Sequence, residues 1–281
     1  MDIRLIASDV DGTILPRGGV ISERTIAAVH ACKARGIDYV IASGRWYVSA
    51  KVIADALRLT EGVMIIANGG AVVDIAGNIL REWVMPRPQA ERAYRLLRQA
   101  PVMVNAFVRN AVYRVNTRAY HTPPKGLGDY LGGEYRMVND DVSQFERFGL
   151  EDVYKLEAYG DDPETLARLK GELEREGYSV TSAYHTNIEI MGLESGKGTA
   201  LRWLLQERGL SREQCAAFGD NLNDQTLLEA AGCAVAMGNA IPQLKRVASL
   251  VARDCEQDGE AEILEAIAES KEIIHAAHRI V

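Results

Sequence analysis

The sequence predicts an α/β protein in which a doubly wound parallel sheet is interrupted by a second, inserted α/β domain. Over the first eighty residues, short apolar runs alternate with amphipathic segments, an order typical of a parallel sheet covered by helices. This alternation stops near residue 82 and resumes near residue 189. A chain of 281 residues is long enough for two domains. We therefore expect a core formed by residues 1–81 and 189–281, with an inserted domain at 82–188.

The first half of the core is predicted to contain three strands. The first covers residues 3–8 and is followed by a helix that Ser22 caps and Gly36 ends. Apolar and β-branched residues predict the second strand at 39–42 and, after another helix, the third strand at 63–67. Ligands bind at the carboxyl ends of parallel strands, so we expect the polar residues that follow these strands to meet at one edge of the sheet.

The segment 82–188 is predicted to form an antiparallel sheet with helices on one face, because its strand-like runs follow one another with few helices between them. The expected helices cover residues 88–98 and 163–177, and the second of them begins at Asp162-Pro163. A stretch rich in Gly, Pro, Tyr and Asp follows the second of the expected strands, which are 103–108, 112–116, 154–159, 179–184 and 187–191.

The alternation typical of the core resumes after Gly192, with a helix predicted at 198–208 and a strand at 215–218. A further helix ends near Gly232 and precedes a strand at 234–236. We therefore interpret this part of the chain as the second half of the interrupted sheet.

The composition is that of a globular protein, with 47% hydrophobic and 25% charged residues. A net charge of −7 argues against nucleic acid or an anionic membrane as the main partner. No apolar run approaches the roughly 20 residues that span a bilayer. The four cysteines form no CxxC pair and the histidines lack metal-ligand spacing, so neither a zinc site nor a disulfide framework is predicted. Because the sequence starts directly with a strand rather than a signal peptide, we expect a cytoplasmic protein. We expect it to be a monomer or a small homo-oligomer.

Two aspartates, Asp9 and Asp11, follow the first strand in the stretch DVDGT (9–13). Side chains alternate along a strand, so these two carboxylates are expected to point the same way despite their mutual repulsion. Further polar residues end other strands or begin helices of the same sheet: Ser43-Gly44-Arg45, Asn68, Lys197 within SGKG, and Asp220-Asn221-Leu222-Asn223-Asp224.

The carboxylates of Asp9, Asp11, Asp220 and Asp224 would need a partner of opposite charge if they met at this edge. At separations of roughly 4 to 8 Å, each pair repels by about 2 to 4 kcal/mol with an effective dielectric constant near 20. The sum rivals the net stability of a domain, so either the carboxylates titrate or a cation holds them. Oxygen ligands of this kind suit Mg²⁺.

With Mg²⁺ at this edge, the neighbouring residues acquire roles in phosphoryl transfer. Asp9 can attack phosphorus and form an aspartyl-phosphate. Asp11 can protonate the departing oxygen and then deprotonate the attacking water. Ser43 and the neighbouring backbone N–H, at a helix start, can bind a phosphate oxygen, and Lys197 can neutralise charge on the transferring group.

Four segments resemble, in this order, the four motifs of the haloacid dehalogenase superfamily: LIASDVDGTIL (5–15), IASGR (41–45), ESGKGTAL (194–201) and FGDNLND (218–224). The stretch VAMGNA (235–240) and the position of the insert resemble the Cof-type phosphatases of subfamily IIB. The resemblance covers essentially the whole chain and implies a Rossmann-like core with a C2B-type α/β cap. Gln225-Thr226 and Glu194-Ser195-Gly196 depart from the usual residues, but neither departure removes a chemical group.

The resemblance also assigns roles to individual residues. It implies that Asp9 is the nucleophile and that Asp11 is the acid/base. It implies that Mg²⁺ is held by Asp9, the backbone carbonyl of Asp11 and Asp220. Asp224 is expected near the same ion. The phosphate-binding positions that the resemblance implies are Ser43, Gly44, Lys197 and Asn223.

Several of these residues also have ordinary explanations. Ser43 alone is typical of a helix N-cap, and Lys197 alone is typical of a solvated lysine at a helix start. The residues of 220–224 could serve as turn residues that cap a helix. DVDG resembles the start of a calcium-binding loop, but that loop needs a glycine at position six and a glutamate at position twelve. Arg45 and Asn68 end strands, so they are candidates for substrate contacts or for purely structural residues.

We therefore predict a Mg²⁺-dependent phosphatase that hydrolyses small phosphomonoesters through a covalent aspartyl-phosphate on Asp9. The resemblance includes enzymes for sugar phosphates, pyridoxal phosphate and flavin mononucleotide. The cap is expected to close over the site and select the substrate, and residues 120–130 form either a selecting loop or a surface connection.

Three alternatives use similar groups. They are a phosphosugar mutase, a phospho-accepting signalling domain, and a non-catalytic sensor of phosphorylated metabolites. The short spacing between Asp220 and Asp224 favours a phosphatase over a mutase, and the long insert argues against a signalling domain.

Overall fold

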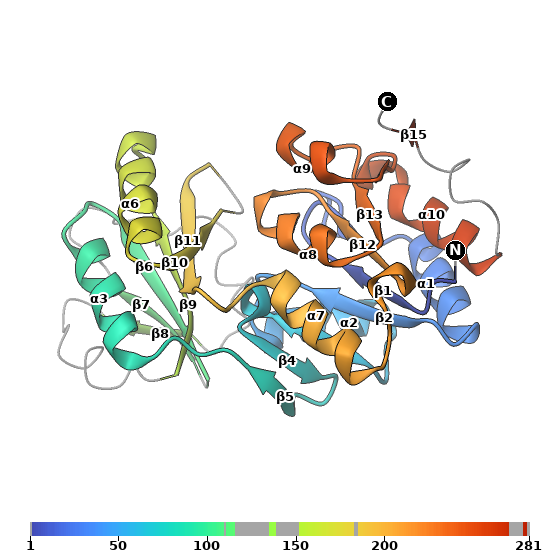
Figure 1. The fold of residues 1–281 in the computed structure, drawn as a ribbon, viewed down its shortest axis with the longest axis horizontal. Coiled ribbons are helices and arrows are strands. Elements are labelled where there is room, and N and C mark those ends of the chain that lie inside the picture. Colours follow the sequence, from blue (N-terminus) through green and yellow to red (C-terminus); the bar gives the residue numbers. More distant parts are fainter. Residues whose placement is uncertain are drawn as a thin grey trace.

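The computed structural model describes residues 2–109, 111–115, 135–138, 152–182, 185–269 and 278–279. Within these ranges the strands form two sheets, one of nine strands and one of six, which we call the core sheet and the cap sheet. Figure 1 shows them side by side, each with its own helices. The central parallel sheet with covering helices confirms the predicted α/β fold class. The loop predicted at 120–130 lies outside the described residues.

The core sheet has the strand order β15-β14-β13-β12-β1-β2-β3-β4-β5. Its parallel strands are β1 (Leu5–Ser8), β2 (Asp38–Ala42), β3 (Val63–Ile66), β12 (Cys215–Gly219), β13 (Cys233–Ala236) and β14 (Leu250–Val251). Antiparallel strands extend both edges: β4 (Ala71–Asp74), β5 (Ile79–Glu82) and β15 (His278–Arg279).

The carboxyl end of β1 is the point at which the order of this sheet reverses. From β1 the chain continues to β2 on one side, and after the cap it returns in β12 on the other side. Ligands bind at such switch points in open α/β sheets. All four residues of β1 are buried, as expected for a strand with helices on both faces.

Helices cover both faces of the core sheet (Figure 1). On one face α1 (Glu23–Ala34) packs beside α10 (Gly259–Ala268), and on the other α7 (Lys197–Glu207) packs beside α8 (Gln225–Ala230). The Ser22 hydroxyl accepts the backbone N–H of Thr25 at 3.1 Å, which confirms Ser22 as the N-cap of α1. The remaining elements of the core are α2 (Tyr47–Ala56), α9 (Pro242–Val247), η1 (Ala67–Gly69), η2 (Arg212–Gln214), η3 (Leu222–Asp224) and η4 (Cys255–Gln257).

The cap sheet has the order β10-β11-β9-β6-β7-β8. Its strands are β6 (Met103–Val108), β7 (Ala111–Val115), β8 (Tyr135–Val138), β9 (Val153–Tyr159), β10 (Tyr178–Thr181) and β11 (Asn187–Gly192). The prediction of a purely antiparallel sheet was wrong at one edge, because β7 and β8 pair in parallel. The strand β8 lies in the Gly-rich and Pro-rich stretch to which no strand was assigned.

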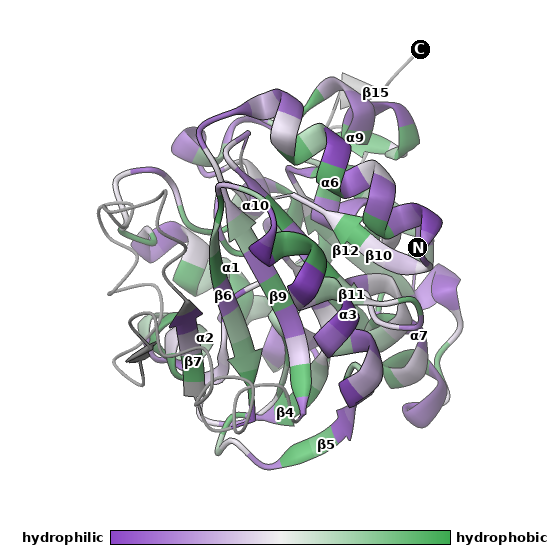
Figure 2. Ribbon diagram, turned by 90° about the vertical axis from the view of Figure 1, so that its left-hand side faces the viewer, coloured by the Kyte–Doolittle hydropathy of each residue, from purple (hydrophilic) through white to green (hydrophobic). Residues whose placement is uncertain are grey.

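Two helices, α3 (Arg87–Arg98) and α6 (Pro163–Arg175), cover one face of the cap sheet. Figure 2 shows hydrophilic and hydrophobic residues alternating along them, as expected for helices that bury one side. The buried residues of α3 include Tyr94 and Leu97, and those of α6 include Leu169 and Leu173. Among the helices that the structure describes, none is long and apolar enough to cross a membrane.

The other face of the cap sheet packs toward the core. Phe107 and Tyr154 of the cap belong to the same buried apolar cluster as the core sheet. The ring of Tyr154 lies 5.0 Å from that of Trp46, at the start of α2. The cap is therefore held against the loop that follows β2, where polar site residues were predicted.

The hairpin of β4 and β5 was missed by sequence analysis. Asn68-Gly69-Gly70 was interpreted only as the end of a parallel strand, whereas the chain turns there through η1 and pairs back antiparallel on β3. Asn68 adopts a left-handed conformation with φ of 55°, and Gly69 has φ of +88°. The turn is thus part of both the sheet edge and the predicted site.

We expect Gly69→Ala to lower the free energy of unfolding by about 2 kcal/mol or more. A Cβ at Gly69 would lie 2.2 Å from the carbonyl oxygen of Gly196, and a positive φ already disfavours alanine. Urea unfolding measures the effect. As a control, Gly171→Ala in α6 meets nothing within 4 Å and should stabilise the protein by about 0.5 to 1 kcal/mol. Equal stability of Gly69→Ala and the wild type would contradict this account.

Candidate active site

A cavity of about 660 Å³ opens at the carboxyl ends of β1, β2 and β12, where the sequence predicted the site. The cap contributes Glu189, from β11, to its wall. Six of the predicted residues line it together: Asp9, Asp11, Ser43, Gly44, Asp220 and Asn223. The structure therefore brings together residues that are more than two hundred positions apart in the sequence.

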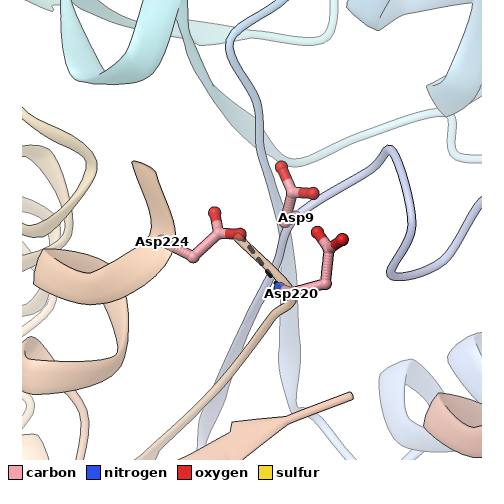
Figure 3. A group of neighbouring side chains, drawn as sticks. All are labelled: Asp9, Asp220 and Asp224. Carbon is pink, nitrogen blue, oxygen red and sulfur yellow. Dashed lines mark hydrogen bonds between the residues drawn. The ribbon is translucent and has the colours of Figure 1, made fainter. Parts of the chain in front are cut away.

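Three carboxylates form an acidic cluster at one end of this cavity. Asp9, Asp220 and Asp224 each place one oxygen within 4.8 Å of the others. Figure 3 shows the three side chains lying close together. The second carboxylate oxygen of Asp224 accepts the backbone N–H groups of Asp220 and Asn221 at 3.0 and 3.1 Å. These two bonds fix the turn that carries Asp220 after β12.

Lys197 is the cation of this cluster. Its ammonium group lies 2.6 Å from Oδ1 of Asp9 and 2.6 Å from Oδ1 of Asp224, and the side chain is fully buried. Lys197 begins α7, which can approach α8 closely because the next residue is Gly198. A Cβ at Gly198 would lie 2.1 Å from the carbonyl oxygen of Thr226.

One lysine does not balance three neighbouring carboxylates, of which those of Asp9 and Asp224 are buried and that of Asp220 is partly buried. Burial and the charge of Asp224 raise the pKa of Asp9 to about 7, although Lys197 opposes this shift. Burial and the charge of Asp9 raise the pKa of Asp220 to about 9. Burial disfavours the charged ammonium of Lys197, but Asp224 and Asp9 outweigh it and raise the pKa of the lysine. The cluster therefore lacks positive charge in its fully ionised state.

The residues present fit a divalent cation that prefers oxygen ligands. Asp220 Oδ1 is buried and makes no hydrogen bond to the part of the chain that the structure describes. A Cβ at Gly12 would lie 2.5 Å from the other carboxylate oxygen of Asp220, so the turn after β1 leaves no room for a larger side chain there. An oxygen that is buried and unpaired beside two further carboxylates is the kind of ligand that Mg²⁺ uses.

Asp11 lies apart from the acidic cluster. Its carboxylate forms a two-pronged ion pair with Arg45, with N–O distances of 2.9 and 2.6 Å. The argument from strand alternation does not apply, because β1 ends at Ser8 and both aspartates lie in the turn that follows. Asp9 and Asp11 share the cavity because of this turn, and they point to different partners.

The other predicted residues are placed as follows. Ser43 follows β2, and its hydroxyl accepts the backbone N–H of Arg45 at 3.1 Å. Asn223 donates to the side-chain oxygen of Asn68 at 3.3 Å, and Asn68 donates to Glu189 at 2.9 Å. Arg45 and Asn68 thus contact other residues of the site, and their predicted contact with substrate stays a prediction.

A buried cluster of the cap, centred on Lys155, was missed by sequence analysis. Its ammonium group donates to Glu189 at 2.6 Å, to Glu157 at 3.1 Å and to the backbone carbonyl of Gly44 at 3.0 Å. All three charged side chains are buried. In β9 and β11 these residues alternate with apolar ones, a pattern that is typical of a strand with one solvent-facing side. The one available signal was opposite charges at alternate positions of two strands.

Lys155 also sets the charge state of its neighbours. Burial alone would raise the pKa of Glu189, but Lys155 and Asn68 outweigh it and lower that pKa. Burial raises the pKa of Glu157, although Lys155 opposes this shift. The cap therefore presents an ionised Glu189, already paired, to the wall of the cavity.

Comparison with known proteins gives a consistent result. The sequence model of the haloacid dehalogenase-like hydrolases matches residues 6–264. The HMP-PP phosphatase of Serratia proteamaculans is 30% identical, with 93% of this chain and 94% of that protein covered. The phosphatase YwpJ of Bacillus subtilis is 27% identical, with 93% and 99% covered.

Solved structures share the fold over nearly the whole chain. A haloacid dehalogenase-like hydrolase from B. subtilis superposes with a TM-score of 0.84 at 25% identity, covering 94% of this chain and 99% of that one. A second one, from Bacteroides thetaiotaomicron, has a TM-score of 0.79 at 26% identity, with 94% and 99% covered. A sugar phosphatase of subclass IIB, at 19% identity and a TM-score of 0.78, supports the fold alone.

The match from the first strand through most of α10 includes all four of the motifs on which the predicted resemblance was based. The match at 6–264 covers far more than half of the chain, and the fold agrees independently. The chain belongs to the haloacid dehalogenase-like hydrolases.

Proposed function

We propose that this protein is a Mg²⁺-dependent phosphatase that hydrolyses small phosphomonoesters through a covalent aspartyl-phosphate on Asp9. The observation that carries the proposal is the cluster of Lys197 and three aspartates, two of which, Asp9 and Asp220, line a cavity bounded by the cap. The phosphatase names of the relatives from S. proteamaculans and B. subtilis support the same reaction. The predicted cap, 82–188, ends inside β11, which pairs within the cap sheet, so we further propose 82–192 as the cap and 1–81 and 193–281 as the catalytic core.

Asp9 acts as the nucleophile in this proposal. Lys197 binds Oδ1 of Asp9 and favours its ionised form, which leaves Oδ2 as the attacking oxygen. The bond from this oxygen to phosphorus forms as the bond from phosphorus to the leaving oxygen breaks, and water later hydrolyses the aspartyl-phosphate. Lys197 also lies where it can neutralise charge on the transferring group.

Asp9, Asp220 and the backbone carbonyl of Asp11 would hold Mg²⁺, with Asp224 beside them. When bound, Mg²⁺ supplies positive charge to the carboxylates and to a phosphate oxygen. The phosphate group itself would be bound by Ser43, Gly44, Lys197 and Asn223.

Asp11 handles protons in the proposed reaction. It protonates the leaving oxygen in the first step and removes a proton from water in the second. Both of its carboxylate oxygens contact Arg45 in the structure, so one oxygen must leave Arg45 and take up a proton from solvent as the substrate enters, before Asp11 can protonate the leaving oxygen. Arg45 thus orients Asp11 before the substrate binds.

The substrate class follows from the cavity and its wall. A volume of about 660 Å³ is typical of sites for small metabolites, and its polar wall suits a hydroxylated leaving group. One relative is named as a phosphatase of HMP-PP and another as a phosphatase of 5-amino-6-(5-phospho-D-ribitylamino)uracil, both small phosphorylated compounds. We propose substrates of this size, including sugar phosphates, pyridoxal phosphate and flavin mononucleotide.

Asp9→Asn should reduce phosphate release from a panel of such monoesters to below about 1% of the wild-type rate, because an amide oxygen is a poor nucleophile. Release of inorganic phosphate with Mg²⁺ and with EDTA measures this. Asp2→Asn, at an exposed position near the N-terminus, is the matched control and should keep the wild-type rate. Substantial activity of Asp9→Asn would contradict the covalent route. A wild type that binds Mg²⁺ but releases no phosphate would favour the mutase or the sensor.

Asp220→Asn should raise the Mg²⁺ concentration for half-maximal activity by about tenfold or more. It should also change stability in opposite directions with and without metal. In EDTA the variant should melt above the wild type, because the folded wild type must either keep Asp220 ionised beside two carboxylates or take up a proton, and an amide needs neither. In excess Mg²⁺ the melting temperature of the wild type should rise more than that of the variant. Melting curves that shift equally under both conditions would reject Asp220 as a ligand.

Lys155→Met should lower the free energy of unfolding by about 3 to 5 kcal/mol and lower the rate of phosphate release. It leaves Glu157 and Glu189 buried without their cation, and the carbonyl of Gly44 loses its donor. Urea unfolding and steady-state rates measure both effects. Lys170→Met, in the exposed pair with Glu174 on α6, is the control and should change stability by less than about 0.5 kcal/mol. A loss of stability no larger than that of the control would refute this role of Lys155.

A further inference from the structure

A second buried polar group lies directly behind Asp9, on the side away from the cavity. It consists of Ser8 from β1, Tyr39 from β2 and Glu260 from α10, with exposed fractions of 1%, 3% and 2%. The Ser8 hydroxyl lies 2.8 Å from Glu260 Oε2 and 2.8 Å from the backbone carbonyl oxygen of Asp9. The Tyr39 hydroxyl lies 2.9 Å from Glu260 Oε1. None of these three residues was singled out by the sequence.

With Glu260 ionised, the hydrogens available to this group cannot reach every acceptor: Tyr39 can donate to Oε1, but Ser8 would have to serve both Oε2 and the carbonyl of Asp9. A serine hydroxyl carries one hydrogen, and here two oxygen acceptors lie at the same distance from it. The conflict disappears when Glu260 carries a proton on Oε2. Glu260 then donates to Ser8, Ser8 donates to the Asp9 carbonyl, and Tyr39 donates to Oε1. Every oxygen in this series of hydrogen bonds then has a partner.

The surroundings also favour the neutral acid. Burial raises the pKa of Glu260 to about 8, and the charge of Asp9 adds to this, while hydrogen bonds from Ser8 and Tyr39 oppose it. The titratable groups that face Glu260 are Asp9 near β1, Tyr39 on β2 and Cys32 on α1. Burial and the charge of Glu260 raise the pKa values of Tyr39 and Cys32, so both stay neutral hydrogen donors.

We propose that Glu260 is a positioning residue that acts in its protonated form, holding the main chain of Asp9 through Ser8. This inference rests on the proposed role of Asp9 as the nucleophile. The chain of hydrogen bonds runs from Tyr39 through Glu260 and Ser8 to the carbonyl of Asp9, and thereby links α10 and β2 to the residue that attacks phosphorus. It fixes the peptide from which the Asp9 side chain projects.

Ionisation of Glu260 would break this series of hydrogen bonds at Ser8. A carboxylate is a stronger acceptor than a peptide carbonyl, so the single Ser8 hydrogen would turn to Glu260 and leave Asp9. A new negative charge would also lie behind Asp9, where it opposes ionisation of the nucleophile. We therefore expect the rate of the chemical step to fall as pH rises through about 8, the value to which burial raises the pKa of Glu260.

The same proton makes folding depend on pH. The pKa of Glu260 is raised from 4.5 to about 8, so between these values the folded protein keeps a proton that the unfolded chain has lost. Its contribution to stability is complete below pH 4.5 and is lost as pH rises through about 8. Glu260→Gln is neutral at every pH, and its amide can donate to Ser8 and accept from Tyr39.

The first experiment compares melting temperatures of the metal-free wild type and Glu260→Gln from pH 5 to pH 9.5. The melting temperature of Glu260→Gln minus that of the wild type should increase up to about pH 8 and then stay constant. Glu265→Gln on the same helix is the control. The ion pair with Arg24 lowers the pKa of Glu265 from 4.5, so this group is ionised in the folded and unfolded chain from pH 5 upward, and the difference for Glu265→Gln should not vary with pH in this range. A difference for Glu260→Gln that does not vary with pH would overturn the neutral state of Glu260.

The second experiment measures kcat and KM for phosphate release as a function of pH. It uses the wild type and Glu260→Gln and adds two further variants, Ser8→Ala and Glu260→Ala. Ser8→Ala and Glu260→Ala should each lower kcat about tenfold at pH 7 with little change in KM. Glu260→Gln should restore kcat and remove the decline above pH 8. If melting behaves as expected but Glu260→Gln keeps the wild-type pH profile, the positioning role is refuted.

Failure of the proposed function gives a different result. A wild type without phosphatase activity would refute that function, whereas the melting experiment would still decide whether Glu260 is protonated.

Discussion

The buried ammonium of Lys197 between Asp9 and Asp224 is the interaction on which the rest of the structure depends. It joins the turn after β1 to the start of α7 and to η3, both of which follow the cap in the sequence. The turn at 220–224 depends on it too, because Asp224 uses one oxygen for Lys197 and the other for backbone N–H groups. The position at which the chain returns from the cap is thus fixed by charge as well as by apolar packing.

A buried lysine between two carboxylates also lies at the contact between cap and core. Lys155 lies between Glu157 and Glu189 as Lys197 lies between two aspartates, and both lysines are fully buried. A buried lysine costs desolvation free energy, and close carboxylate acceptors offset this cost in both clusters. The third acceptor of Lys155 is the carbonyl of Gly44, in the core. This bond connects the charge balance of the cap with the loop proposed to bind phosphate.

Much of the site was predictable because its residues stand at strand ends, and parallel strands bring their carboxyl ends together. That geometry gathers Asp9, Ser43 and Asp220 without any knowledge of side-chain packing. It does not predict the direction of a side chain in a turn, so the separation of Asp11 from the acidic cluster was missed. Lys155 was missed for a related reason, because alternation along β9 shows which residues share a face but not that the core covers this face. The hairpin of β4 and β5 depends on η1, where Asn68 adopts a conformation that local sequence does not dictate.

Carboxyl groups are accommodated in three ways within this small region. Asp224 is paired with a lysine, Asp220 has an oxygen that makes no hydrogen bond within the described ranges and fits a cation, and Glu260 is proposed to keep its proton. A carboxyl group that keeps its proton suits a position behind the nucleophile. Burial and Asp224 already raise the pKa of Asp9 to about 7, so a further negative charge on its other side would oppose the ionised form that attack requires. A neutral acid can hold the same main chain by hydrogen bonds without adding that charge. The arrangement therefore separates two tasks, since charge around the cavity serves binding and catalysis while neutral donors behind Asp9 fix its position.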